Sequence, residues 1–283
     1  SDLVGWRFDV ARKAWNVPEG EDVPWISGVI DRSSIEIRER IAGRERIYLL
    51  IVNTPAQCVI GGDRNEVEQL VRDMNATFMP LTAPSTVHCD LLRSVETAYR
   101  ELHLMRTTPP ADIDFYSAAW GRKYDLNRES AAEAIVAQAV DTIDFPRVIE
   151  QAYADGVRIF VEIGPGSSCT KMIDEILGER PHLARAALPN TSRPVEAFLE
   201  LLAALIAEGV PVDLSYLYGE SSEKGREPSN VDHAAKPAVR EIVTRVGGSA
   251  FEIPTPPGGW KFREVPTEEV VDQIETHDGT HAD

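Results

Sequence analysis

In the first third of the chain, short apolar runs alternate with segments of helical periodicity. Residues 32–42 and the segment that follows Asp63 place apolar side chains at helical spacing, and Asp63 is a residue type that caps helix starts. Strands are predicted by the apolar or β-branched runs at 25–30, 47–52, 58–60 and 77–81. Residues 24–82 therefore read strand-helix-strand-strand-helix-strand, which predicts a ferredoxin-like unit: a four-stranded antiparallel sheet with two helices on one face.

From residue 83 onwards, strands alternate with helices, as is typical of parallel α/β architecture. The run 158–163 is apolar enough for a buried strand. Helices are predicted at 91–104, 128–140, 194–208 and from the capping residue Asp144 to 154, and further strands at 113–118 and 185–188. After residue 219 the chain becomes polar and then acidic, which predicts a linker and a tail.

The charge and cysteine content exclude several classes of function. A net charge of −17, from 29 basic and 46 acidic residues, does not favour nucleic-acid binding, which needs clustered Lys and Arg. The three cysteines show neither a disulfide framework nor a CxxC metal pattern, so we expect a cytoplasmic protein with neither metal nor cofactor. No apolar run approaches the roughly 20 residues that a membrane span requires, so no membrane association is expected.

His88 is the strongest candidate for chemistry. It lies between the predicted ferredoxin-like unit and a helix, where an imidazole can line a cleft and act as a general base. The alternative is a structural histidine. The side chain of the neighbouring Cys89 should diverge from that of His88, so a Cys–His pair is not expected, and Cys89 is interpreted as a small buried residue.

Two further patterns bear on catalysis. Gly164-Pro165-Gly166 lies between a predicted strand and a helix, where it could bind an anion or simply form the turn. The sequence contains no G-x-S-x-G nucleophile motif. These residues thus offer a candidate base without a serine for it to activate.

The order of four motifs resembles malonyl-CoA:acyl-carrier-protein transacylases and synthase acyltransferase domains. The motifs are Asn53-Thr54-Pro55, Val59-Ile60-Gly61-Gly62, His88 and Val161-Glu162-Ile163-Gly164-Pro165-Gly166. The sequence around Ile47 to Asp63 and around His88 is most similar to the acyltransferases of polyunsaturated fatty-acid synthases and iterative polyketide synthases. The resemblance covers about residues 1–219.

The resemblance implies a hydrolase-like parallel α/β subdomain with an inserted ferredoxin-like subdomain. Residues 24–82 would be the insert, 1–23 and 83–219 parts of the large subdomain, and 220–283 a linker and acidic tail. It also implies transfer of an acyl group, malonyl above all, from CoA to the phosphopantetheine thiol of an acyl carrier protein. His88 would be the general base, oriented by a backbone carbonyl near Asp144, although Asp144 could simply cap its helix.

In this family the nucleophilic serine, the oxyanion donors and the arginine for the extender carboxylate precede the insert. We therefore expect them upstream of Ser1, in the remaining N-terminal part of the domain, and expect the isolated chain to be inactive. Ser85-Thr86-Val87, just before the histidine, matches neither the malonyl nor the methylmalonyl pattern, so the acyl group stays open. A non-catalytic scaffold or carrier-protein docking piece is the main alternative, and an unrelated serine or cysteine hydrolase a weaker one.

Overall fold

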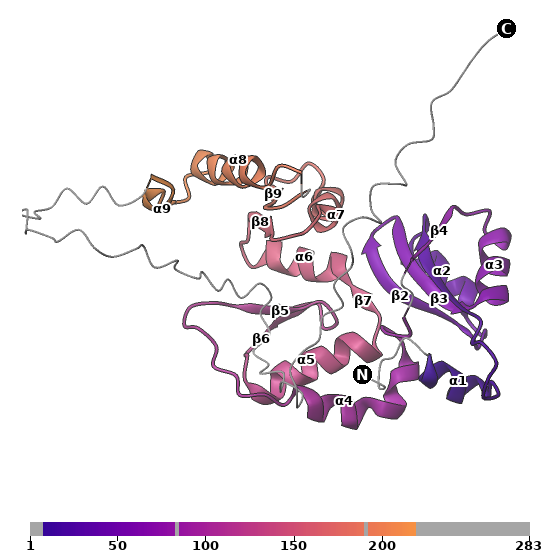
Figure 1. Cartoon of the computed structure of the whole chain (residues 1–283). Helices are drawn as coiled ribbons and strands as arrows, with labels where there is room; N and C mark the ends of the chain where they lie inside the picture. Colours follow the sequence, from indigo (N-terminus) through magenta and orange to yellow (C-terminus); the bar gives the residue numbers. More distant parts are fainter. Residues whose placement is uncertain (1–7, 83–84, 190–191, 219–283) are drawn as a thin grey trace, which may run out of the picture. The chain divides into compact units, whose positions relative to one another are not determined.

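Within the residues that the computed structural model describes, 8–82, 85–189 and 192–218, the largest sheet has five strands in the order β4-β1-β3-β2-β7 (Figure 1). Four come from the predicted ferredoxin-like segment, and these four pair with one another antiparallel. The strand bounds are β1 Trp25–Ile30, β2 Ile47–Thr54, β3 Gln57–Asp63, β4 Phe78–Pro80 and β7 Ile143–Asp144. The predicted strand-helix order of this segment is confirmed.

Two helices, α2 (Ser34–Ile41) and α3 (Arg64–Asp73), cover one face of this sheet (Figure 1). Ser33 begins α2 with a capping box, and Asp63 begins α3 by accepting from two backbone N–H groups of its first turn. Ile37 of α2 and Leu70 of α3 are fully buried in one apolar cluster with residues of β1, β2 and β3. The shared cluster confirms that both helices lie on the same face.

The opposite face packs against segments from outside the ferredoxin-like unit. Trp25 and Val59 point there and form a cluster with Trp15 of α1 (Asp9–Trp15) and with Cys89, which precedes the 3₁₀ turn η1 (Asp90–Val95). Trp25 stacks between Trp15 and Tyr48, with ring centroids 5.6 and 5.9 Å apart. Both faces of the sheet are therefore buried, and one of them contacts the segment that carries His88.

The sheet also has a fifth strand that the sequence pattern did not indicate. β7 pairs parallel to β2, through Ile51 with Ile143 and Val52 with Asp144. The predicted four antiparallel strands are therefore present, but the prediction of a sheet with four strands was wrong because β7 adds a fifth at one edge. The physical reason is that β2 would otherwise be an edge strand with unpaired backbone groups, and a short passing segment can satisfy them.

Between β4 and β7 the chain is mostly helical, and it includes the segment that carries His88. The predicted helix at 91–104 is divided into η1 and α4 (Glu96–His103), whereas the predicted helix at 128–140 is found with the same bounds as α5 (Arg128–Val140). Between them, β5 (Phe115–Ser117) and β6 (Arg122–Tyr124) form a hairpin, of which β6 was not predicted. α6 (Phe145–Ala154) follows β7 directly and is capped by Asp144 as predicted.

The last described segment contains the parallel pair β8 (Ile159–Glu162) and β9 (Leu183–Ala186). The helices around it are α7 (Ser168–Leu177), α8 (Pro194–Ala207) and α9 (Ser215–Tyr218). The prediction that residues 158–163 form a buried strand was wrong about burial, because Val161 is 40% exposed and Ile163 is 73% exposed. Strands of parallel sheets are normally covered on both faces, and here that cover is incomplete within the described residues.

None of the helices in the described part of the chain combines the length and apolarity of a membrane span. The predicted linker and acidic tail, residues 220–283, lie outside the described residues. The same is true of residues 1–7 at the other end.

Replacing Gly62 by Ala should destabilise the sheet strongly. A Cβ atom there would lie 2.1 Å from the carbonyl oxygen of Arg46, at a φ of +151°. Backbone cannot move aside as a side-chain end can, so we expect a loss of at least about 2 kcal/mol in the free energy of unfolding. Gly43→Ala is the matched control, since Gly43 has a φ of +80° with nothing within 4 Å of the added atom. It should cost only about 1 kcal/mol, the conformational penalty alone. Equal losses in urea unfolding would contradict the packing argument.

Candidate active site

His88 occupies an unusual backbone conformation at the junction between β4 and η1. Its φ is +66°, in the left-handed region, which costs a non-glycine residue about 1–3 kcal/mol. The backbone N–H of His88 donates to the carbonyl oxygen of Ala139 at 2.7 Å. This bond fixes the backbone of the junction against α5 and directs the imidazole towards the end of that helix.

The imidazole itself bonds to the neighbouring carbonyl of the same helix. Nδ1 of His88 is in hydrogen-bond contact with the carbonyl oxygen of Gln138. A carbonyl can only accept, so Nδ1 carries the proton and donates it, and Nε2 of the neutral ring keeps its lone pair. Among the described residues, Nε2 has no hydrogen-bond partner. The site therefore presents a histidine with one nitrogen held and the other available as a base.

Both acceptors belong to the last turn of α5, whose carbonyls have no partners inside the helix. α5 is 13 residues long, and Asn127 fixes its start through a capping box with Ser130. A helix C-terminus carries partial negative charge, which favours a cation close to it. The end of α5 can therefore orient the neutral imidazole and also stabilise the imidazolium that forms when His88 accepts a proton.

Burial keeps the resting imidazole neutral. Desolvation lowers the pKa of His88 from its usual value near 6.5, and the hydrogen bond to the Gln138 carbonyl opposes this only in part. At neutral pH the lone pair on Nε2 is thus present, as a general base requires.

The structure corrects the expectation for Asp144. The carbonyl that meets His88 belongs to Gln138, so the prediction of a carbonyl near Asp144 was wrong. Asp144 instead caps α6, where its carboxylate accepts from the N–H of Arg147 at 3.0 Å, and it pairs with Val52 in the sheet. A usable signal existed in the sequence: the helix at 128–140 was predicted with the right end, and unpaired carbonyls always lie in the last turn.

Cys89 is buried, as expected. Its thiol donates to the carbonyl oxygen of Thr86 at 3.4 Å. Burial raises the pKa of Cys89 to about 12, so the reactive thiolate is not formed at neutral pH. His103 has a local structural role, because its Nδ1 lies 2.7 Å from the Tyr99 carbonyl oxygen one turn earlier.

At Gly164-Pro165-Gly166 the structure favours the turn over the anion site. The helix that follows, α7, already has a carboxylate at its start. Glu162 accepts from the backbone N–H of Thr170 at 2.8 Å and from its hydroxyl at 2.9 Å. A second anion would meet this negative charge, so the positive end of the helix is used internally. Among the described residues there is also no group of three or more His, Cys, Asp or Glu suited to a metal.

The comparisons with known proteins concern the sequence and the fold of the chain. No family model matches the chain. A subunit of the polyunsaturated fatty acid synthase of Thraustochytrium sp. is 22% identical over 226 residues, which are 75% of this chain and 11% of that protein. The malonyl CoA-acyl carrier protein transacylase of Escherichia coli K12 is 26% identical over 198 residues, covering 65% of this chain and 60% of the transacylase.

Solved structures give the fold. The acyltransferase domain from the second module of the salinomycin polyketide synthase matches with a TM-score of 0.63 at 23% identity, covering 79% of this chain and 53% of that one. The malonyl-CoA:acyl carrier protein transacylase of Xanthomonas oryzae matches with a TM-score of 0.55 at 19% identity, covering 69% and 61%. This chain has the acyltransferase fold. The predicted α/β class and the resemblance to this family are confirmed, and the chain spans about 60% or less of the relatives and structures named here.

The depressed pKa of His88 has a testable consequence for stability. The folded-state pKa lies below the unfolded value near 6.5, so the unfolded chain binds more protons as the pH falls through that value. The free energy of unfolding should therefore fall on acidification below pH 6.5. Above that pH the histidine is neutral in both states, and the destabilising effect of its protonation should vanish. His88→Gln should show a smaller loss than the parent between pH 7 and pH 5 in urea unfolding. An NMR titration of the His88 ring with a midpoint at or above 6.5 would contradict this assignment.

Proposed function

We propose that this chain is the histidine-bearing part of an acyltransferase of a fatty-acid or polyketide synthase. The observation that carries the proposal is the arrangement at His88: Nδ1–H donates to the Gln138 carbonyl and Nε2 is unpaired among the described residues. The acyl group is malonyl, as the names of the transacylase relatives suggest, and it passes from CoA to the phosphopantetheine thiol of an acyl carrier protein. His88 is the general base, and no metal or cofactor takes part.

The first half of the reaction transfers the acyl group to a serine. Nε2 of His88 removes the proton from the serine hydroxyl while its oxygen attacks the thioester carbonyl, because a serine is a weak nucleophile at its own pKa. The resulting imidazolium is stabilised by the Gln138 carbonyl at the end of α5. When the C–S bond breaks, this proton goes to the departing CoA sulfur, and an acyl-serine ester remains.

The second half repeats these steps with another thiol. Nε2 now takes the proton of the phosphopantetheine thiol, and the sulfur attacks the acyl-serine ester. The C–O bond breaks, and the serine oxygen recovers its proton from His88. The acyl group ends on the carrier protein and His88 returns to the neutral Nδ1–H form.

The serine is proposed to come from a segment outside these 283 residues. The sequence has no G-x-S-x-G, and the relatives named above are longer than the part matched here. The exposed apolar residues of the last described segment support this. Val161 of β8 and three residues of α8, namely Val195, Phe198 and Leu199, are each at least 40% exposed. Apolar faces of this kind are normally covered in a parallel α/β subdomain, and the serine-bearing segment is the proposed cover.

The isolated chain should therefore form no acyl-enzyme. After incubation with malonyl-CoA or acetyl-CoA, intact-mass spectrometry should show the unmodified mass, because the serine is absent and the Cys89 thiol is buried and protonated. A stable adduct on a serine or cysteine of this chain would refute the proposed division of the site and favour the hydrolase alternative.

Adding the segment that precedes the chain in its parent protein should restore acyl transfer. In that complete domain, His88→Ala should slow acylation by malonyl-CoA by roughly 10² to 10⁴-fold, the range for loss of a general base. Cys89→Ala is the matched control at the adjacent position, and it should change the rate little because its buried thiol donates to the Thr86 carbonyl and is not directed at the His88 ring.

Both variants are first checked for folding by circular dichroism. A folded His88→Ala domain that acylates at the parent rate would remove His88 from the mechanism. A complete domain that binds carrier protein but transfers no acyl group, with or without His88, would favour the scaffold alternative.

A further inference from the structure

The segment that runs from the last turn of α5 to the start of α6, residues 138–144, bonds in two directions, and we name it the α5–β7 junction. On one side, the carbonyls of Gln138 and Ala139 hold the ring and the backbone of His88. On the other side, the hydroxyl of Thr142 donates to the carbonyl oxygen of Leu49 at 2.8 Å, and β7 pairs with β2. The junction thus links the ferredoxin-like sheet directly to the histidine.

Thr142 makes this link at an irregular point of the sheet. The pairing of β2 with β3 shifts register between Leu49 and Ile51, as in a β-bulge, and the Leu49 carbonyl at this point accepts the hydroxyl. Bulges interrupt the backbone ladder and bend the strand locally. The threonine is β-branched, so few side-chain rotamers are open to it and its hydroxyl is held in direction. The bond therefore fixes where β7 begins relative to β2.

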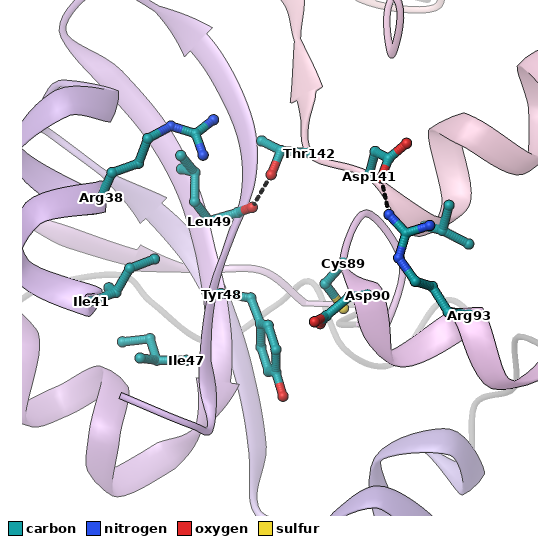
Figure 2. Close-up of a pocket in the computed structure, with 11 residues that line it drawn as sticks. Arg38, Ile41, Ile47, Tyr48, Leu49, Cys89, Asp90, Arg93, Asp141 and Thr142 are labelled. Atoms are coloured by element: carbon teal, nitrogen blue, oxygen red, sulfur yellow. Dashed lines mark hydrogen bonds and ion pairs between the residues drawn. The ribbon is translucent and has the colours of Figure 1, made fainter. Parts of the chain in front are cut away.

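A second link at the junction is weaker. Asp141 pairs with Arg93 of η1, the turn that begins two residues after His88 (Figure 2). Both side chains are about half exposed, so solvent screens the pair and it contributes little. This ion pair can support the junction but cannot replace the partly buried Thr142 bond.

Packing does not make the Thr142 bond redundant either. A cavity of about 270 Å³ lies beside the junction, between the ferredoxin-like sheet with α2 and the turn η1. The residues that line it include Thr142, Leu49, Cys89 and Arg93. In Figure 2, Thr142 reaches Leu49 on the sheet, whereas Asp141 reaches Arg93 on η1. Side chains do not fill this space, so at this point the Thr142 hydroxyl is not supported by close packing on the side of the cavity.

We propose that Thr142 is a positioning residue for His88: its bond to Leu49 fixes the α5–β7 junction. The junction in turn holds the Gln138 carbonyl, which selects the Nδ1–H tautomer, and the Ala139 carbonyl, which holds the backbone of His88. Its importance for catalysis rests on the function proposed above. Thr142 does not contact the reacting atoms in this scheme. It acts by keeping Nε2, and not Nδ1, as the nitrogen that can accept a proton.

The test compares Thr142→Val with the parent in the 283-residue chain, labelled with ¹⁵N. Valine keeps the branched shape and removes the hydroxyl. In the parent, the ring ¹⁵N shifts should show the Nδ1–H tautomer, and the backbone amide of His88 should be protected from hydrogen exchange. In Thr142→Val the two ring shifts should move towards each other as tautomers mix, and exchange of the His88 amide should speed up about five- to tenfold, as expected for one lost hydrogen bond.

Two further variants make the result specific. Thr142→Ser keeps the hydroxyl and should restore both signals. Thr170→Val removes a similar bond, in which the hydroxyl of Thr170 on α7 donates to Glu162 of β8 at 2.9 Å. This variant should leave both His88 signals as in the parent. A general loss of stability would change the His88 amide in both valine variants, whereas a positioning role changes it only in Thr142→Val.

The proposal is overturned if folded Thr142→Val keeps the parent tautomer and the parent exchange rate at His88. Should Thr142→Val not fold, Thr142→Ala and Thr142→Ser replace it, and equal ring ¹⁵N shifts in those two would equally overturn the proposal. These measurements need no acyl transfer, so they remain decisive if the proposed function fails. Conversely, a complete domain in which His88→Ala is fully active would refute the function without changing the tautomer result.

Discussion

The arrangement at the site depends on the unpaired carbonyls at the end of α5. A helix cannot satisfy the acceptors of its own last turn. Here the carbonyls of Gln138 and Ala139 take the ring N–H and the backbone N–H of His88. The backbone bond holds the left-handed conformation of His88, the ring bond selects the tautomer, and both place the imidazole at the negative end of a helix. A residue far away in sequence thereby has one ring nitrogen held and the other unpaired among the described residues.

The ferredoxin-like sheet matters to the site because of its outer strand. β2 would expose an unpaired edge, and β7 covers it immediately after α5 ends. Residues 138–144 therefore both add a strand at the edge of the sheet and present two carbonyls to His88. An inserted unit with its own apolar core is in this way tied to the catalytic candidate by a strand pair and by the Thr142 hydroxyl, with a cavity left between them.

The last described segment, by contrast, leaves apolar side chains exposed. β8 and β9 form a parallel pair whose apolar residues Val161 and Ile163 are substantially exposed. The helices α7 and α8 cannot cover every face of the pair within the described residues. This incomplete burial, the absence of a nucleophile motif and the partial match to longer relatives are three independent observations that support a site completed by further residues.

The sequence by itself determined the elements with strong local signals: the strand and helix order of 24–82, the helix at 128–140 and the cap at Asp144. These follow from local preferences, which need only neighbouring residues. Tertiary structure decided the rest. The partner of His88 is Gln138 and not a residue near Asp144, because that contact joins groups 50 positions apart in the chain. β7 has two residues and no pattern of its own, since it is a strand only where the edge of β2 lies beside it.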